Sequence, residues 1–141
     1  MKHALSLSVL LLCAPGAAWS APGDHFVENW DLDGDGTVIL AEIEERRGAV
    51  FAAFDADEDE RLDAGEYVYF DEARANDMAD NADHGGGRMQ RASEGMTLGF
   101  NDTDGDGAVS LAEFLDGSAA WLAMIDRNED GVVTRADFGN R

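Results

Sequence analysis

The sequence predicts an all-α fold made of helix–loop–helix units, with four units in two tandem pairs and short β-bridges between their loops. Acidic residues gather in four short stretches, which begin at Asp31, Asp55, Asp102 and Asp126. The first two starts are 24 residues apart, as are the last two, which indicates that a two-loop unit is duplicated. Between the stretches, apolar residues recur at the helical period.

Residues 1–20 have the pattern of a secretory signal peptide. A positive start is followed by an apolar run over residues 4–12, too short to span a bilayer, and by small residues before a cleavage site at Ala21. The alternative, a buried N-terminal helix, has no amphipathic period to support it. We therefore expect a periplasmic or secreted protein with no membrane partner after cleavage. The single cysteine, Cys13, lies in this segment, so no disulfide is expected in the remainder.

The chain after residue 20 divides into two similar halves. Residues 21–80 hold the first loop pair, and residues 89–141 hold the second. Residues 81–88 between them form a Gly-rich segment that is predicted to be a flexible linker. Both pairs are expected to share one compact domain.

The segments between the loops predict helices whose apolar faces form the core. Residues 40–54 and 111–125 each place apolar side chains on one helical face. Shorter helices are expected before the first loop, after the second and before the third, around Trp30, Tyr67 and Met89. The methionines in these stripes would also suit a groove for an unidentified protein partner.

The charge balance is strongly acidic. The chain has 30 Asp and Glu residues against 10 Lys and Arg, a formal net charge of −20. Self-repulsion of this size opposes a compact state unless cations bind. The same charge disfavours nucleic acid and anionic membrane surfaces as partners.

The acidic stretches match the ligand pattern that calcium needs. Calcium takes six to eight oxygen ligands, and a twelve-residue loop supplies them from positions 1, 3 and 5, the backbone carbonyl of position 7 and a bidentate Glu at position 12, with Gly at position 6 for the turn. The first and third stretches match throughout. Their predicted ligands are Asp31, Asp33, Asp35, Thr37 and Glu42, and Asp102, Asp104, Asp106, Ala108 and Glu113.

The second and fourth stretches depart from this pattern. In the second, Glu60 replaces the glycine at position 6, where a side chain is strained at positive φ. In the fourth, Asp137 replaces Glu at position 12, and its shorter side chain is expected to bind through one oxygen and to favour a smaller ion. The predicted ligands are Asp55, Asp57, Asp59, Arg61 and Glu66, and Asp126, Asn128, Asp130, Val132 and Asp137. The alternative is that a loop has lost its metal and only keeps the fold.

Position 8 is apolar in all four stretches, as Val38, Leu62, Val109 and Val133. In paired loops this residue forms a short β-bridge and packs into the core, whereas a solvated acidic stretch has no reason to place an apolar residue there. With these features the chain resembles the EF-hand family. The resemblance implies Ca²⁺ as the bound ion, at up to four sites.

The spacing between the loops decides which of them pair. If residues 40–54 form one helix, it is about 22 Å long, so the first and second loops lie at opposite ends and pair with the fourth and third. Alternatively, Gly48 and Gly117 break their helices and let each tandem pair fold back on itself. The continuous helix is favoured.

This crowded spacing is also similar to that of lanmodulin, an exported family whose EF-hands prefer lanthanide ions. Lanmodulin loops typically carry Pro at position 2, and none of the four loops does so here. They also favour Asp at position 9, where only Asp63 fits. Lanthanide binding is therefore kept as an alternative to calcium.

Calcium binding by an exported sensor or buffer is the leading function. The alternative is an interaction module in which bound metal only sets the shape that docks a protein partner. Catalysis is not expected, because only His25 and His84 remain after residue 20 and no nucleophile–base pairing is evident.

Overall fold

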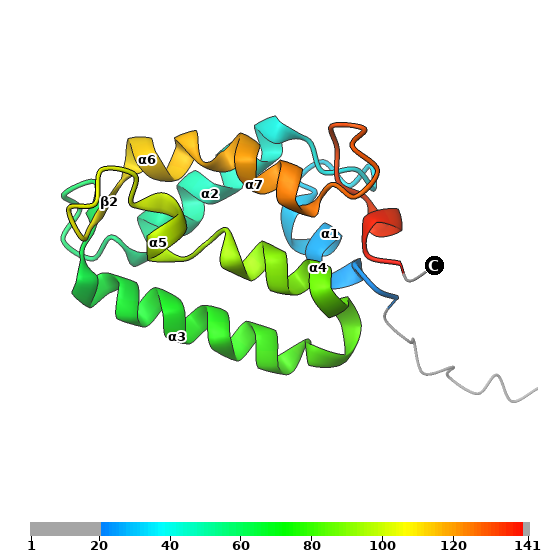
Figure 1. Cartoon of the computed structure of the whole chain (residues 1–141), viewed down its shortest axis with the longest axis horizontal. Coiled ribbons are helices and arrows are strands. Elements are labelled where there is room, and N and C mark those ends of the chain that lie inside the picture. Colours follow the sequence, from blue (N-terminus) through cyan, green and yellow to red (C-terminus); the bar gives the residue numbers. More distant parts are fainter. Residues whose placement is uncertain (1–20, 140–141) are drawn as a thin grey trace, which may run out of the picture.

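The computed structural model describes residues 21–139, without the side chains of residues 82–85, so the predicted signal peptide lies outside it. The described chain is mostly helical, as predicted (Figure 1). Its elements are α1 (Asp24–Trp30), α2 (Leu40–Phe54), β1 (Arg61–Leu62), α3 (Ala64–Asp80), α4 (Ala82–Glu94), α5 (Leu98–Asn101), β2 (Val109–Ser110), α6 (Leu111–Asp116), α7 (Ser118–Ile125) and the short 3-10 helix η1 (Arg135–Asp137). Within residues 21–139, no helix has both the length and the apolar content needed to cross a bilayer.

The acidic loops gather at the two ends of the molecule (Figure 1). We call them loop 1 (31–42), loop 2 (55–66), loop 3 (102–113) and loop 4 (126–137). At one end, β1 of loop 2 pairs antiparallel with β2 of loop 3, with Leu62 opposite Val109. At the other end, Val38 of loop 1 and Val133 of loop 4 exchange backbone hydrogen bonds of 2.8 and 2.9 Å. The predicted pairing of loop 1 with loop 4 and of loop 2 with loop 3 is therefore confirmed.

Helix α2 spans the distance between the two ends. It runs from loop 1 to loop 2 without interruption at Gly48, as the continuous-helix prediction requires. The helix predicted over 111–125 is divided instead, because α6 ends and α7 begins on either side of Gly117, which has φ −70° and ψ −10°. A Cβ at Gly117 would lie 3.0 Å from Asn101 Oδ1, so the close approach of α5 favours glycine there.

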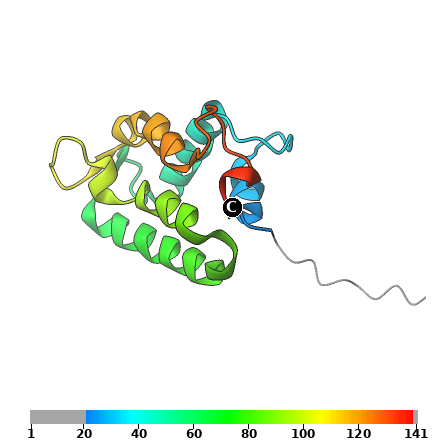
Figure 2. The same ribbon diagram turned by 45° about the vertical axis from the view of Figure 1, so that its right-hand side comes forward.

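Helices α3 and α4 form an antiparallel hairpin that packs beneath α2 and α7 (Figures 1 and 2). The segment 81–88, predicted as a flexible linker, contains the turn after α3 and the first part of α4. Gly86 within it has a non-helical φ of 51° and ψ of −148°, which kinks α4. The single helix expected before the third loop is two helices, α4 and α5, separated at residues 95–97. The Gly-rich segment thus reverses the chain and brings α4 back onto α3.

The core is an aromatic-rich cluster that contains side chains from both halves of the chain. Trp30 of α1 and Trp121 of α7 have ring centroids 4.5 Å apart. Phe51 of α2 lies 5.6 Å from Phe114 of α6, again by ring centroids. The position-8 side chains of all four loops are fully buried in the same cluster. Each aromatic ring buries a large apolar area, so these cross-half contacts stabilise the arrangement that holds the loops in place.

Gly95, directly after α4, is required by close packing and not by its backbone angles. Its φ of −70° suits any residue, but an added Cβ would lie 1.9 Å from Trp121 Cδ1. The Trp121 indole is held in place because its Nε1 donates to the Ala92 carbonyl at 2.8 Å. We expect Gly95→Ala to lower the free energy of unfolding by about 2 kcal/mol through overpacking.

Denaturant unfolding would measure this effect, with Gly99→Ala as the matched control. An added Cβ at Gly99 meets no neighbouring atom within 4 Å. Equal stability of the two variants would contradict the packing explanation.

Candidate metal centre

Each loop begins with an aspartate that follows a helix, and its carboxylate organises the turn. In loop 1, Asp31 Oδ1 accepts the N–H of Gly34 at 2.7 Å and Asp31 Oδ2 accepts that of Gly36 at 2.8 Å. The N–H of position 6 reaches the position-1 carboxylate at 3.0 Å in loop 2, 3.0 Å in loop 3 and 2.8 Å in loop 4. The four loops therefore make the same turn although their sequences differ.

The carboxylate at position 12 closes each loop. Glu42 accepts the Leu32 N–H at 2.8 Å through Oε1 and the Ile39 N–H at 2.9 Å through Oε2. Glu66 and Glu113 bridge the amides of positions 2 and 9 in the same way in loops 2 and 3. This carboxylate therefore ties the start of the loop to the helix that follows it.

Asp137 makes the same bridge in loop 4 despite its shorter side chain. Its Oδ1 accepts the Arg127 N–H at 2.9 Å, and its Oδ2 accepts the Thr134 N–H at 2.8 Å. The residue lies at the end of η1 and is almost fully buried. Both oxygens of Asp137 are thus directed into the loop.

Three loops gather carboxylates closely enough to share one ion. The ligand atoms of positions 1, 3 and 12 lie within 4.8 Å of one another in loop 1 (Asp31, Asp33, Glu42), loop 2 (Asp55, Asp57, Glu66) and loop 3 (Asp102, Asp104, Glu113). Two unit charges about 5 Å apart repel by about 3 kcal/mol at an effective dielectric of about 20. A divalent cation between them would turn this repulsion into attraction. The all-oxygen donor set fits a hard ion such as Ca²⁺ and lacks the nitrogen and sulfur ligands of softer metals.

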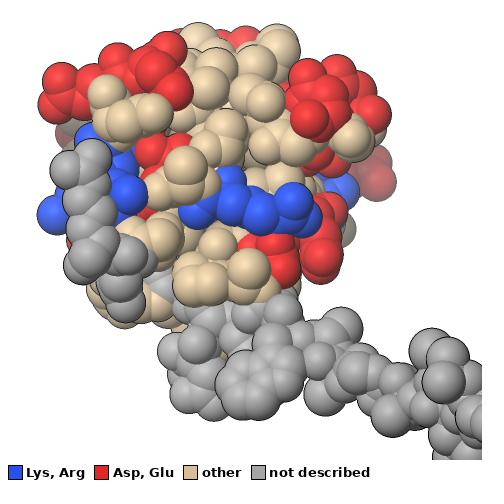
Figure 3. Space-filling view, turned by 90° about the vertical axis from the view of Figure 1, so that its right-hand side faces the viewer, with Lys and Arg blue, Asp and Glu red and all other residues tan. Residues whose placement is uncertain are grey.

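The remaining predicted ligands also lie within these turns. Each position-5 carboxylate accepts the N–H of position 7, at distances of 2.8, 2.8, 2.9 and 3.1 Å, in the pairs Asp35–Thr37, Asp59–Arg61, Asp106–Ala108 and Asp130–Val132. Loop 4 has the least acidic set, since position 3 is Asn128, whose Nδ2 donates to Asp130 Oδ2 at 2.7 Å. Around loops 1 and 4, acidic side chains form separate surface patches with basic side chains between them (Figure 3).

The pKa values of carboxylates in these loops are shifted in opposite directions. A hydrogen bond from the Asp35 amide lowers the pKa of Asp33, but desolvation and the neighbouring carboxylates together raise it above its usual value. Desolvation and nearby carboxylates likewise raise the pKa of Asp57. Hydrogen bonds from the Ser110 amide and hydroxyl lower the pKa of Glu113 to about 2. Position 3 of loops 1 and 2 therefore carries charge that the protein leaves uncompensated, which a bound cation would stabilise.

Two positions in each loop need left-handed backbone. Position 6 has positive φ in every loop: 87° at Gly36, 63° at Glu60, 87° at Gly107 and 88° at Gly131. Position 4 has it as well: 77° at Gly34, 59° at Glu58, 73° at Gly105 and 59° at Glu129. The requirement at position 4 was not predicted, although the glycines there in loops 1 and 3 were the signal for it. Loop 2 carries a strained glutamate at both positions.

Glycine at position 60 is expected to strengthen loop 2. Glu60→Gly removes a side chain held at φ 63° and one negative charge beside the ligands. We expect a gain of about 1 kcal/mol in stability, with calcium affinity in loop 2 up to about tenfold higher. Denaturant unfolding in chelator and calcium titration would measure the two effects. Glu60→Gln removes the charge but keeps the strained backbone, so an equal gain in that variant would show that charge, and not φ, limits the loop.

An ion pair crosses from loop 2 to loop 3. The side chain of Arg61 donates to Asp106 Oδ2 at 2.5 Å. Hydrogen bonds from the Ala108 amide and from Arg61 lower the pKa of Asp106. Both side chains of the pair are about two-fifths exposed, so its contribution to stability is small. It nevertheless places a cation from one loop beside a predicted ligand of the next.

Arg47, in the middle of α2, holds both ends of loop 3. Its guanidinium is fully buried and donates to Asn101 Oδ1 at 2.6 Å and to the Phe114 carbonyl at 3.0 and 2.6 Å. Asn101 directly precedes loop 3, and Phe114 directly follows it. Burial lowers the pKa of Arg47 to about 10. This role was not predicted, although Arg47 lies four residues from both Ile43 and Phe51 on the apolar face of α2.

Comparison with known proteins agrees with this geometry. The EF hand family model matches residues 101–116 and 119–140, which contain loops 3 and 4. Among curated proteins, the chain is 26% identical to "Calcium-binding protein LPS1-beta" of Lytechinus pictus, over 88% of this chain and 69% of that protein. The fold and the loops thus define a helix–loop–helix metal-binding protein. These matches support the predicted resemblance to the EF-hand calcium-binding family.

Proposed function

We propose that all four loops bind calcium and that the protein is an exported calcium buffer whose fold is stabilised by the bound ions. The observation that carries this proposal is the convergence of the carboxylates of positions 1, 3 and 12 in loops 1, 2 and 3. Loop 4 is included because its backbone amides meet Asp126 and Asp137 in the same way. Side chains at positions 1, 3, 5 and 12 and the carbonyl at position 7 would supply the oxygen ligands.

The shared helix favours a buffer over a sensor. α2 leaves loop 1 and enters loop 2, and α6 with α7 connects loop 3 to loop 4. A rotation of α2 that opened loop 1 would therefore also displace loop 2 and its bridge to loop 3. We expect calcium to tighten the molecule with little exposure of new apolar surface.

A calcium titration of the metal-free protein would test this proposal. Tryptophan fluorescence would follow the core, where Trp30 and Trp121 report on one place because their rings are in contact. The apolar dye ANS would follow newly exposed surface, and a parallel lanthanum titration would test the lanthanide alternative.

The outcome of this titration distinguishes a buffer from a sensor and calcium from lanthanides. Saturation by calcium without added dye binding supports a buffer, whereas increased dye binding would favour a sensor or a metal-shaped interaction module. A response to lanthanum alone would show that the loops bind lanthanides and not calcium. A protein that responds to neither ion would contradict metal binding.

The proposal includes no catalytic activity. His25 pairs with Asp77 at 2.9 Å and lies 3.2 Å from Asn29, but no Ser, Thr or Cys side chain in the described part of the chain is hydrogen-bonded to it. A nucleophile–base pair of the usual kind is thus not formed at this histidine.

Export is proposed from the sequence pattern of residues 1–20. Mass spectrometry of the protein recovered outside the cytoplasm would test it, with an N-terminus at Ala21 as the expected result. Recovery of the full-length chain inside the cell alone would contradict it.

A further inference from the structure

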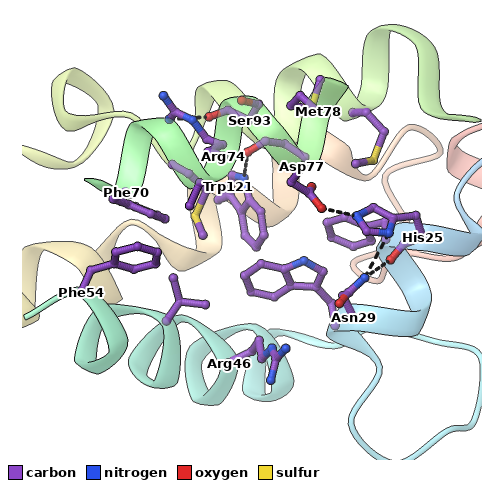
Figure 4. Close-up of a pocket in the computed structure, with 17 residues that line it drawn as sticks. His25, Asn29, Arg46, Phe54, Phe70, Arg74, Asp77, Met78, Ser93 and Trp121 are labelled. Atoms are coloured by element: carbon purple, nitrogen blue, oxygen red, sulfur yellow. Dashed lines mark hydrogen bonds and ion pairs between the residues drawn. The ribbon is translucent and has the colours of Figure 1, made fainter. Parts of the chain in front are cut away.

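A cavity of about 240 Å³ lies between helices α1, α2, α3, α4 and α7, and none of its lining residues belongs to loops 1–4 (Figure 4). Its wall is mainly aromatic rings and thioethers, among them Trp30, Phe54, Trp121 and Met89. Aromatic side chains offer flat apolar surface, and methionine adapts to the shape of what it contacts. At the ~30 Å³ that a water molecule occupies in the liquid, the cavity holds roughly eight non-hydrogen atoms. That is the size of one aromatic ring with a short tail.

The ionisable side chains at the edge of the cavity have partners, with one exception. Arg74 donates to the Ser93 carbonyl at 3.1 Å, and Asp77 pairs with His25 (Figure 4). Arg46 of α2 also lines the cavity, but it makes no hydrogen bond or ion pair with any residue that the structure describes. Its side chain is partly buried.

Among the described residues, Arg46 shares its lack of a carboxylate partner with Arg91 of α4, but Arg91 is exposed and outside the cavity, whereas Arg46 is partly buried and lines it. Arg46 is partly buried as a residue, and its guanidinium has no hydrogen-bond partner in the described chain. A guanidinium matches a carboxylate in shape as well as charge, because two parallel N–H groups meet two oxygens. An apolar cavity with an unpaired guanidinium at its edge is therefore complementary to an apolar body that ends in a carboxylate.

We propose that this cavity binds a small apolar carboxylic acid, with its ring or alkyl chain among the aromatic side chains and its carboxylate at Arg46. A partner helix fits less well, because helix recognition uses a row of anchor side chains along a groove and this cavity has room for one group. The basic helices that acidic proteins attract would also bring further positive charge to Arg46. The site is separate from the loops, so this proposal can be tested independently of the proposed calcium function.

Titration with hydrocinnamate would test the proposal directly, because Trp30 and Trp121 line the cavity and report on its contents. The neutral analogue hydrocinnamyl alcohol has the same ring and tail without the charge. The full chain would be titrated with each compound, both in calcium and in chelator. We expect a Kd on the order of 10⁻⁴ M for hydrocinnamate and about tenfold weaker binding of the alcohol.

Three variants separate the contributions. Arg46→Gln should reduce hydrocinnamate binding to the level of the alcohol and leave alcohol binding unchanged. Arg91→Gln, which removes the same charge from an exposed position on α4, should change neither. Ala73→Phe places a ring at the exposed edge of the cavity and should abolish binding of both compounds, with circular dichroism to confirm its fold.

Two results would overturn the proposal. If neither compound changes the fluorescence at millimolar concentration in either metal state, the cavity is not a ligand site. If acid and alcohol bind equally, or if Arg91→Gln weakens the acid as much as Arg46→Gln, the carboxylate does not meet Arg46. Displacement of hydrocinnamate by the basic amphipathic peptide melittin, with equal affinity for wild type and Arg46→Gln, would assign the cavity to a helical partner instead.

Discussion

Glu113→Gln is expected to weaken calcium binding in loop 3 by about 100-fold, which corresponds to roughly 2.7 kcal/mol. Glu113 joins the amides of Thr103 and Ser110 through its two oxygens, at 3.1 and 2.9 Å. Glutamine keeps the volume of the side chain but has one acceptor oxygen and no charge. It can therefore neither bridge the loop nor supply a bidentate ligand, so both the empty loop and the bound state lose stabilisation.

Calorimetric titration would measure the number of sites and the affinity of each. Glu94→Gln removes the same charge from an exposed position outside the loops and serves as the control. Because β1 and β2 join loops 2 and 3, and Arg61 contacts Asp106, we expect the affinity of loop 2 to fall with that of loop 3. Loops 1 and 4, at the other end of the molecule, should change less. A binding curve identical to that of the wild type would remove loop 3 from the set of sites.

Arg47→Met is expected to lower the free energy of unfolding by about 3 kcal/mol. The substitution removes the guanidinium from the Phe114 carbonyl and from Asn101 Oδ1, and each buried acceptor left unsatisfied costs about 1–3 kcal/mol. It also ends the contact of the guanidinium with the Phe114 ring, whose centre is 4.1 Å away. Removing a buried charge relieves its desolvation and offsets part of this loss. The net change in the free energy of unfolding is a loss, because methionine fills the volume of the arginine stem but donates no hydrogen bond to the two acceptors.

Denaturant unfolding with and without calcium would measure the change, and Arg91→Met at an exposed position on α4 is the control. Calcium affinity in loop 3 should also fall in Arg47→Met, because residues on both sides of the loop lose a common anchor. Arg47→Lys keeps the charge but has a single ammonium in place of the planar fork, so an intermediate stability is expected. Wild-type stability in Arg47→Met would show that the buried cation is dispensable.

Local pattern was sufficient to predict the loops and to favour one pairing of them. Ligands recur within twelve residues, so their spacing is visible in the sequence, and three of the four loops bring their acidic side chains at positions 1, 3 and 12 together as that spacing requires. The pairing followed from helix length once the helix was taken as unbroken, with a break at Gly48 as the alternative. A straight helix between loop 1 and loop 2 separates them by more than a β-bridge can span, and α2 is such a helix.

The sequence by itself thus determined the helical class and the positions of the four acidic loops, because both depend on spacing along a few turns of chain. It favoured the exchange of loop partners between the two halves, which the unbroken α2 and the two bridges then established. Only the tertiary structure decided which side chains meet across the core. Gly95 is needed because Trp121 lies against it, and Arg47 is satisfied because Asn101 and Phe114 approach it from 54 and 67 residues away. Gly117, between α6 and α7, also lies close to Asn101, whose Oδ1 would be 3.0 Å from an added Cβ. Such contacts depend on how close-packed helices fit together, and no local period in the chain encodes that fit.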